Sequence, residues 1–509
     1  MYLGIDVGTS SVKTVLVDPD QRVLASASSD LDVLRVADGR AEQDPAEWIA
    51  GLESTLGTLA GREKKAFRAV RGIGLSGHMH GATLIDAGDA PVRPCMLWND
   101  TRAHAQAQAM DTPRSRELVG NILFPGFTAP KVAWVREREP EAFARTAHVL
   151  LPKDYVRLWL TGERVSEMSD ASGTGWLDVG ARDWAPELVE ATGLSMDAMP
   201  RLVEGSEVSG TLRAELVERF GFASAPVVAG GGGDNAASAC GMGTVAPGTA
   251  FLSLGTSGVL FAANERFLPE PESAVHAFCH ALPGTWHQMG VILAATDSLN
   301  WLARVTGRTP AELAELAAKD AEGDPAPIEP TNTVFLPYLG GERTPHNDAS
   351  VRGALVGLTH GTGPAGLARA VLQGVAFAFR DSREALASAG TTLERAYAIG
   401  GGARSDWWLS QIATALDLPL DVPADGDYGA GLGAARLALI AAEGADPLAV
   451  CTPPPVERTV EPVPGQKDAF DLAAARHREA YLQTAPMMRL APAGRERAGA
   501  IGVRPEKRT

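Results

Sequence analysis

The sequence has little cysteine and no long apolar run. Four cysteines are spread over 509 residues, and no two of them form a CxxC pair. This pattern is typical of a reducing compartment and argues against a disulfide framework or a zinc site. No apolar run approaches the roughly 18 residues that span a bilayer, and no signal-peptide pattern precedes the first apolar strand. We therefore expect a soluble cytoplasmic protein without a membrane partner.

Positive charge is also scarce. Lysine and arginine number 46 against 62 aspartates and glutamates, which gives a net charge of −16 at pH 7. Such a surface repels nucleic acid and anionic membranes, so neither is an expected partner. Small phosphorylated metabolites are anions as well. A site for them must therefore be built locally, against the overall charge of the chain.

Short apolar strands alternate with helices over most of the chain. Strands are expected at 2–6, 11–18 and 22–28, a helix begins at 44–47, and further strands follow at 69–76 and 226–229. This alternation predicts an α/β fold with a mixed sheet. The length alone favours roughly three domains of about 150 residues each.

An internal repeat refines the domain prediction. The segments YLGIDVGTSSVKTVLV and AFLSLGTSGVLFA each predict a strand, a Gly-Thr-Ser turn and a returning strand. Two copies so far apart indicate two related domains rather than a solenoid, whose period is about 20–50 residues. We expect a first domain over 1–246 and a second over 247–484, which includes a long helix that begins near Pro364. Residues 485–509 lack periodicity and are rich in proline, glycine, alanine and arginine, which predicts a flexible tail.

The two repeated turns are candidate phosphate sites. Each exposes successive backbone N–H groups and two hydroxyls, a donor set suited to phosphate oxygens. One turn alone is ordinary hairpin chemistry, but two of them can grip a polyphosphate from both sides. Lys13 can add a cation, and Asp6 can hold Mg²⁺ or simply cap its turn. The turns comprise Gly8, Thr9 and Ser10, and Gly255, Thr256 and Ser257.

A second glycine-rich run ends in an acidic residue. Asp234 follows the glycines 230–233 at the point where a strand gives way to a helix. A carboxylate in this place can accept the proton of a hydroxyl that attacks a phosphorus atom. The alternative is an ordinary helix N-cap. A third glycine run, 400–402, can place backbone flat against a nucleoside, and no Walker A sequence occurs.

Polar residues suited to a polyol follow two further apolar stretches. Met79 and His80 lie in the segment GHMHG, and Asp100 ends the segment LWND. Imidazole, amide and carboxylate groups beside flat apolar surface are typical of sugar sites. His78 and His80 have the spacing of a metal pair, but no third ligand lies nearby. For His78, a structural role and a sugar contact are equally compatible with the pattern.

In their order along the chain, these motifs resemble the FGGY carbohydrate kinase family, and within it the bacterial xylulokinases. The resemblance runs from Met1 to about Ile440. The tail beyond 485 has no counterpart in the family pattern, His78 stands where glutamine is more usual, and 425–429 is not a clean match. The matching stretches are GIDVGTSSVK, GHMHGATLID, LWND, FTAPK, LLPKDY, GGGDNAA, LSLGTSGV, FLPYLGGERTPH and IGGGARS.

The resemblance implies two RNase H-like domains of the actin-like ATPase fold, with mixed sheets flanked by helices and a cleft between them. It implies transfer of phosphate from ATP, with Mg²⁺, to O5 of D-xylulose, and a possible homodimer. Asp234 is then the general base, Asp6 the metal-side carboxylate, and Met79 and His80 sugar contacts. The nucleoside would lie against Gly401, Gly402 and Ala403. Alternatives are a kinase for ribulose, gluconate, a tetritol or glycerol, and a nucleotide-switch ATPase of the same fold.

Overall fold

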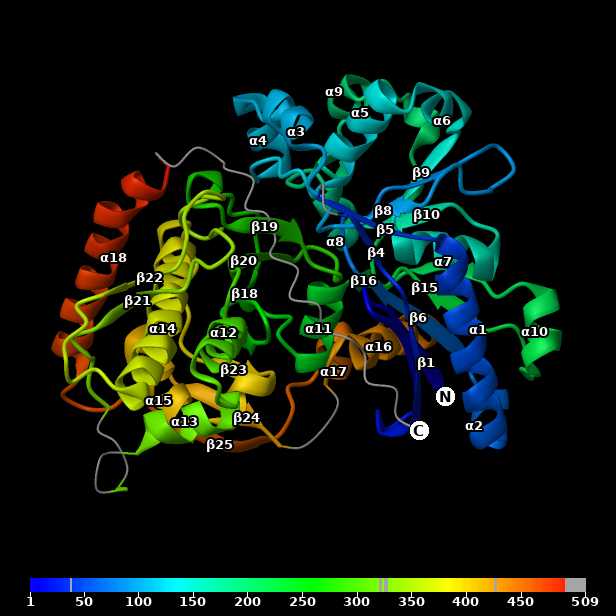
Figure 1. Cartoon of the computed structure of the whole chain (residues 1–509). Coiled ribbons are helices and arrows are strands. Elements are labelled where there is room, and N and C mark those ends of the chain that lie inside the picture. The colour runs from blue at the N-terminus through cyan, green and yellow to red at the C-terminus, as the bar shows by residue number, and fades with distance from the viewer. Residues whose placement is uncertain (37–38, 320–322, 325–327, 425–427, 490–509) are drawn as a thin grey trace, which may run out of the picture.

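The computed structural model describes residues 1–36, 39–319, 323–324, 328–424 and 428–489. Two seven-stranded mixed sheets form the framework, one from each half of the chain (Figure 1). Helices cover both, and a largely helical segment between β6 and β14 lies above the first sheet (Figure 1). Among the described residues, no helix combines the length and apolar character that a membrane crossing requires.

The first sheet has the strand order β14-β15-β6-β1-β2-β3, with β16 beside β6. Its strands are β1 (Tyr2–Val7), β2 (Ser11–Val17), β3 (Val23–Asp30), β6 (Gly72–Gly77), β14 (Val208–Thr211), β15 (Val227–Ala229) and β16 (Gly232–Gly233). The helices of this layer are α1 (Pro45–Arg62), α2 (Lys64–Arg68), α10 (Ala214–Phe220) and α11 (Asp234–Met242). A small sheet beside it contains β4 (Leu34–Val36), β5 (Arg40–Gln43) and β8 (Cys95–Met96).

The inserted segment between β6 and β14 packs its apolar residues against both this half and the second sheet. Its helices are α3 (His104–Met110), α4 (Pro113–Val119), α5 (Thr128–Arg138), α6 (Pro140–Arg145), α7 (Pro152–Thr161), α8 (Met168–Ala171), η1 (Ser172–Thr174), α9 (Pro186–Ala191) and η2 (Met196–Ala198). Its further strands are β7 (Thr83–Ile85), β9 (His148–Leu150), β10 (Val165–Glu167), β11 (Leu177–Asp178), β12 (Asp183–Trp184) and β13 (Arg201–Val203).

The second sheet has the order β19-β20-β18-β17-β23-β24-β25. Its strands are β17 (Ala250–Leu254), β18 (Gly258–Asn264), β19 (His276–Cys279), β20 (Trp286–Ile292), β23 (Ala396–Ile399), β24 (Leu420–Pro423) and β25 (Val456–Val460). The remaining elements are η3 (Pro271–Ser273), α12 (Thr296–Thr306), α13 (Pro310–Ala318), β21 (Val334–Leu336), β22 (Ala354–Val356), α14 (Pro364–Ser388), η4 (Gly401–Arg404), α15 (Asp406–Leu416), α16 (Ala430–Glu443), α17 (Pro447–Val450) and α18 (Lys467–Arg489).

The two sheets share one topology. β1 pairs antiparallel with β2 and parallel with β6, and β6 pairs parallel with β15. In the second sheet β17 pairs antiparallel with β18 and parallel with β23, and β23 pairs parallel with β24. The repeat seen in the sequence is therefore a repeat of the whole strand order, and it brings the two Gly-Thr-Ser turns to equivalent places.

Two details differ from the sequence predictions. The strand expected at 69–76 runs from Gly72 to Gly77, because residues 64–68 form α2 and the chain turns before the strand begins. The flexible tail was predicted to begin at residue 485, but residues 485–489 belong to α18, which continues to Arg489. Residues 490–509 lie outside the described part of the chain.

Helix α16 links the two halves. It comes late in the chain, within the interval predicted for the second domain, yet it packs on β1, β6 and β15 of the first sheet and on α11. The α11–α16 contact is so close that a Cβ on Gly433 would lie 1.7 Å from the backbone oxygen of Ala237. Glycine is therefore required at this crossing.

We expect Gly433→Ala to destabilise the protein strongly, because two helix backbones must separate to admit one methyl group. Overpacking of this kind lowers the free energy of unfolding by about 3 kcal/mol. Thermal unfolding followed by circular dichroism measures the effect. The matched control is Gly57→Ala in α1, where the added Cβ meets nothing within 4 Å and the better helix propensity of alanine favours a small gain. Equal melting temperatures for the two variants would contradict the prediction.

Candidate active site

The first Gly-Thr-Ser turn is held in a fixed shape. The N–H of Gly8 donates to the backbone oxygen of Ser11 over 3.0 Å and closes the loop between β1 and β2. The Thr9 hydroxyl accepts the indole N–H of Trp98 at 3.0 Å, and the Thr9 backbone oxygen accepts the side-chain amide of Gln43 at 2.7 Å. Ser10 is exposed at the tip. The turn is thus held in one shape before any ligand binds, and its tip at Ser10 is exposed to solvent.

The second turn has a different support. The backbone oxygen of Gly255 accepts the N–H of Thr296 at 2.9 Å, and that of Thr256 accepts the N–H of Ala295 at 2.8 Å. These donors belong to the start of α12, so the helix fixes the turn from behind. The side chains of Thr256 and Ser257 are exposed. Both turns therefore present hydroxyls on rigid backbone.

Asp6 and Asp234 are near neighbours. Asp6 ends the apolar run of β1, accepts the hydroxyl of Ser76 at 2.9 Å and lies opposite Lys13 in the β1–β2 register. Asp234 is the first residue of α11. Burial and the negative charge of Asp6 raise the pKa of Asp234 to about 6. Asn235 donates its backbone and side-chain N–H groups to one Asp234 oxygen, at 2.8 and 3.0 Å.

The expected sugar contacts lie beside this carboxylate. A Cβ on Gly233, the residue before Asp234, would come within 2.9 Å of the Met79 side chain. The imidazole of His80 stacks on Phe127 with ring centroids 4.7 Å apart and its Nδ1 contacts the backbone oxygen of Gly173 at 2.6 Å. Burial lowers the pKa of His80 to about 3, so the ring is neutral. Met79 thus lies beside the segment that carries Asp234, and Met79 and His80 both reach Gly173, so that the two side chains together form the candidate sugar wall.

His78 lies in the core rather than at this wall. Its side chain is buried and meets Trp48 edge to face, with centroids 5.9 Å apart. Burial lowers the pKa of His78 to about 3. Of the two readings open from the sequence, this position fits the structural one. Within the described residues, no group of three histidine, cysteine or acidic side chains has a metal-binding arrangement.

Asp100 does not join the site. Its side chain has no exposed surface, and its oxygens accept hydrogen bonds from the Arg102 guanidinium at 3.0 and 2.7 Å and from the N–H of Ala41 at 3.0 Å. A sugar contact would have to break this bidentate pair. In this structure Asp100 is a buried anchor for β5, a position that does not favour the expected contact with the sugar, and that contact stays a prediction. Its neighbour Trp98 is the exposed member of the LWND segment and reaches Thr9 instead.

Two cavities flank the turn after β23. The larger, of about 710 Å³, is lined mainly by apolar residues of α12, α13 and α15, together with Asn300, Gly402 and the charged Glu315 and Arg404. The other, of about 530 Å³, lies between this turn and the start of α16 and includes Ala403 and Arg458. Gly401 lines both cavities. The three residues expected at the nucleoside are therefore divided between two spaces. Residues 425–427, part of the poorly matching segment 425–429, lie outside the described residues.

Sequence reasoning missed the buried cations behind the site. Lys131 in α5 is fully buried and donates to the backbone oxygens of His80, Met96 and Leu97 at 2.8, 3.1 and 2.8 Å. Burial lowers the pKa of Lys131 to about 7. The sequence did contain an indication of this role, because a lysine within an apolar helical stretch needs buried partners. Lys153, the lysine of the LLPKDY segment, is fully buried as well.

This arrangement has the groups that a phosphotransferase acting on a hydroxyl compound requires, and comparison with known proteins shows the class of the enzyme. Residues 1–241 match the model of the N-terminal domain of the FGGY family of carbohydrate kinases, and residues 250–442 match that of its C-terminal domain. The chain belongs to this family and is a carbohydrate kinase, an enzyme class that uses ATP.

Individual relatives are similar over nearly their whole length. The xylulose kinase of Escherichia coli is 45% identical over 491 residues, covering 96% of this chain and all of the relative. The xylulose kinase of Bacillus subtilis is 36% identical, covering 86% of this chain and 87% of the relative. A crystal structure of a "xyloylose kinase" from Brucella ovis is 54% identical with a TM-score of 0.93, covering 96% and 99% of the two chains. The expected fold of two related, actin-like ATPase domains with mixed sheets is confirmed.

Proposed function

We propose that this enzyme transfers the γ-phosphoryl group of ATP to O5 of D-xylulose, giving D-xylulose 5-phosphate and ADP, as a step of D-xylose use. Relatives named xylulose kinase, 45% and 36% identical over most of the chain, support this substrate. The observation that carries the chemistry is the Asp6–Asp234 pair beside Met79. Asp234 has a raised pKa and lies next to the sugar wall, as a general base for a hydroxyl requires.

In the proposed reaction, Asp234 accepts the proton of the 5-hydroxyl as O5 bonds to the γ-phosphorus. The bond from that phosphorus to the β–γ bridging oxygen breaks, and ADP leaves with its electron pair. Phosphoryl transfer needs alignment and charge stabilisation more than covalent participation by the protein. The two Gly-Thr-Ser turns supply backbone N–H groups and hydroxyls to the phosphates, and Lys13 adds a cation on the first turn. Met79 and neutral His80 hold the ketose against the base.

The adenosine is proposed to lie in the larger cavity, against Gly401 and Gly402. An apolar wall with a single amide, Asn300, suits a purine, whose faces are apolar and whose edge carries hydrogen-bonding groups. Ala403 would then support the turn from its other side. The roles of all these residues are proposals that rest on their positions.

The acidic residues also fit Mg²⁺. Asp6 presents carboxylate oxygens near Asp234 and the first turn, and Mg²⁺ prefers one or two carboxylates together with substrate phosphates over an all-protein cage. Bound Mg²⁺ would neutralise charge on the phosphates. Asp6 is the residue proposed to hold it.

Measurement of ADP release over a panel of sugars tests the proposal. We expect strong turnover with D-xylulose, and kcat/KM values at least tenfold lower with L-ribulose, D-ribulose, gluconate, erythritol and glycerol, because loss of a matched polar contact costs about 1.4 kcal/mol or more. A low rate without sugar is expected as well, since closure around the sugar excludes water. Preference for another polyol would keep the kinase and change its substrate. Equal turnover with and without sugar would favour a nucleotide-switch ATPase instead.

The cellular setting is proposed from the thiols. All four cysteines are free and buried, which suits a reducing compartment such as the cytoplasm. A homodimer stays a prediction from the family resemblance.

A further inference from the structure

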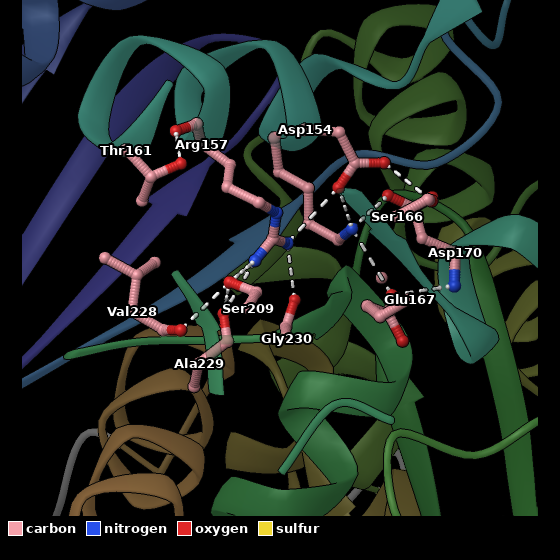
Figure 2. A network of polar contacts seen from close by, with 12 residues as sticks. Asp154, Arg157, Thr161, Ser166, Glu167, Asp170, Ser209, Val228, Ala229 and Gly230 are labelled. Carbon is pink, nitrogen blue, oxygen red and sulfur yellow. Dashed lines mark hydrogen bonds and ion pairs between the residues drawn. The ribbon is translucent and has the colours of Figure 1, made fainter. Parts of the chain in front are cut away.

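A cluster of fully buried charges lies behind the glycine-rich segment that leads to Asp234 (Figure 2). Lys153, Asp154 and Arg157 come from α7, Glu167 ends β10, and Asp170 lies in α8. The Lys153 ammonium lies 2.7 Å from Asp154, 3.1 Å from Asp170 and 3.4 Å from Glu167. Burial of ions costs several kcal/mol each and rarely adds net stability. The role of the cluster is therefore better judged from the backbone that it holds in place than from its contribution to stability.

Arg157 holds the first end of the glycine segment. Its guanidinium donates to the backbone oxygen of Ala229 at 2.7 Å and to that of Gly230 at 2.5 Å, and Figure 2 shows both bonds beside its contact with Asp154. The next residue, Gly231, has a φ of +80°, which favours glycine, and a Cβ there would lie 2.1 Å from the backbone oxygen of Leu75. The backbone of this segment is thus held by Arg157 on one side and by close packing against Leu75 on the other.

Ser169 holds the second end. Its hydroxyl oxygen accepts the N–H of Gly233 at 3.0 Å and donates its proton to Glu167 at 2.9 Å. Glu167 in turn accepts the backbone N–H of Ser169 and is paired with Lys153. Asp234 follows Gly233 directly. The residue that Ser169 holds is therefore the immediate neighbour of the proposed base.

We propose that this cluster is a positioning device for the catalytic base: Arg157 and Ser169 fix the two ends of the segment 230–233 and thereby set the orientation of the Asp234 carboxylate. The inference rests on the proposed role of Asp234. None of these five charged side chains touches that carboxylate in the hydrogen bonds of the described residues, so they act through backbone. Lys153 also packs against the end of β6, because a Cβ on Gly77 would lie only 2.9 Å from the Lys153 Cβ.

The charge balance of the cluster suits this role. Two cations face three carboxyl groups, and burial raises the pKa of Asp170 well above its ordinary value. The cations and carboxyl groups pair with one another, and the raised pKa of Asp234 has burial and Asp6 as its causes rather than any member of this cluster. The cluster therefore holds the segment through contacts without acting on the charge of Asp234 directly.

The sharpest test compares two serines on consecutive elements. Ser169 and Ser172 are both fully buried, and each accepts one backbone N–H at 3.0 Å, from Gly233 and from Cys279 respectively. We expect Ser169→Ala to lower kcat roughly tenfold with little change in the KM for ATP, since small misplacement of a reacting group is costly. Ser172→Ala is expected to keep kcat within about twofold, with a similar change in melting temperature.

A double-mutant cycle then separates positioning from general damage. In the Asp234→Ala background, Ser169→Ala should cause no further loss of residual phosphorylation, measured with radiolabelled ATP, because its effect passes through the missing carboxylate. Equal kcat values for folded Ser169→Ala and Ser172→Ala would overturn the proposal, and so would an additive loss in that background. A fully active Asp234→Ala enzyme would instead overturn the proposed function. Arg157→Lys, with a roughly tenfold or greater loss of kcat, serves as the second variant.

Discussion

Replacement of Asp234 by alanine is expected to lower kcat by about 10³-fold, the middle of the range for a general base. Without the carboxylate, the attacking hydroxyl keeps its proton while O5 approaches the phosphorus. ATP binding should change little, because the two turns and the nucleoside cavity belong to other elements. A coupled assay of ADP release gives kcat, and isothermal titration calorimetry gives the affinity for ATP.

The control for this change is Asp468→Ala. Asp468 also lies in the first turn of a helix, α18, but it is exposed and far along the chain from the site. We expect wild-type kcat for this variant. An Asp234→Ala enzyme that kept more than about a tenth of the wild-type kcat would contradict the role of general base, provided that its melting temperature matched the control.

Asp6→Asn is expected to lower kcat by about 10²-fold and to move the acidic limb of the pH profile to lower pH. In the wild type, Asp234 is active when deprotonated, and its pKa of about 6 places loss of activity below pH 6. The charge of Asp6 is one cause of that raised value. Removal of the charge lowers the pKa of Asp234, so the base stays ionised at more acidic pH. The lower rate at all pH values follows from loss of the carboxylate oxygen that is proposed to hold Mg²⁺.

Ser76→Ala is the matched control for this prediction. The change removes the hydrogen bond from Ser76 to Asp6 but keeps the carboxylate and its charge. We expect a smaller fall in kcat and an acidic limb close to that of the wild type. An acidic limb that stayed in place, or moved to higher pH, in Asp6→Asn would show that the two carboxylates are not coupled. Profiles of kcat against pH from 4.5 to about 8.5, bracketing the pKa, decide between these outcomes.

Local patterns in the sequence predicted much of the site because they are properties of short segments. The Gly-Thr-Ser turns and the glycine run before Asp234 follow from backbone chemistry within a few residues. Asp100 shows where such local patterns stop. Arg102 is only two residues away, but Ala41 comes from a separate segment, and only tertiary packing shows that the Asp100 carboxylate is buried between them.

By itself, the sequence determined the class of fold, the repeated hairpin and a set of candidate residues for phosphate binding, because strand alternation and turn composition act over short distances. The tertiary structure decided which of these residues meet. It buried Asp234 and brought Asp6 next to it, which together raise the pKa of the Asp234 carboxyl, and it placed α16 against the first sheet. It also gathered the buried charges of α7, β10 and α8 behind the glycine segment. Proximity, burial and ion pairing between distant segments depend on tertiary packing, which the amino-acid sequence alone does not show.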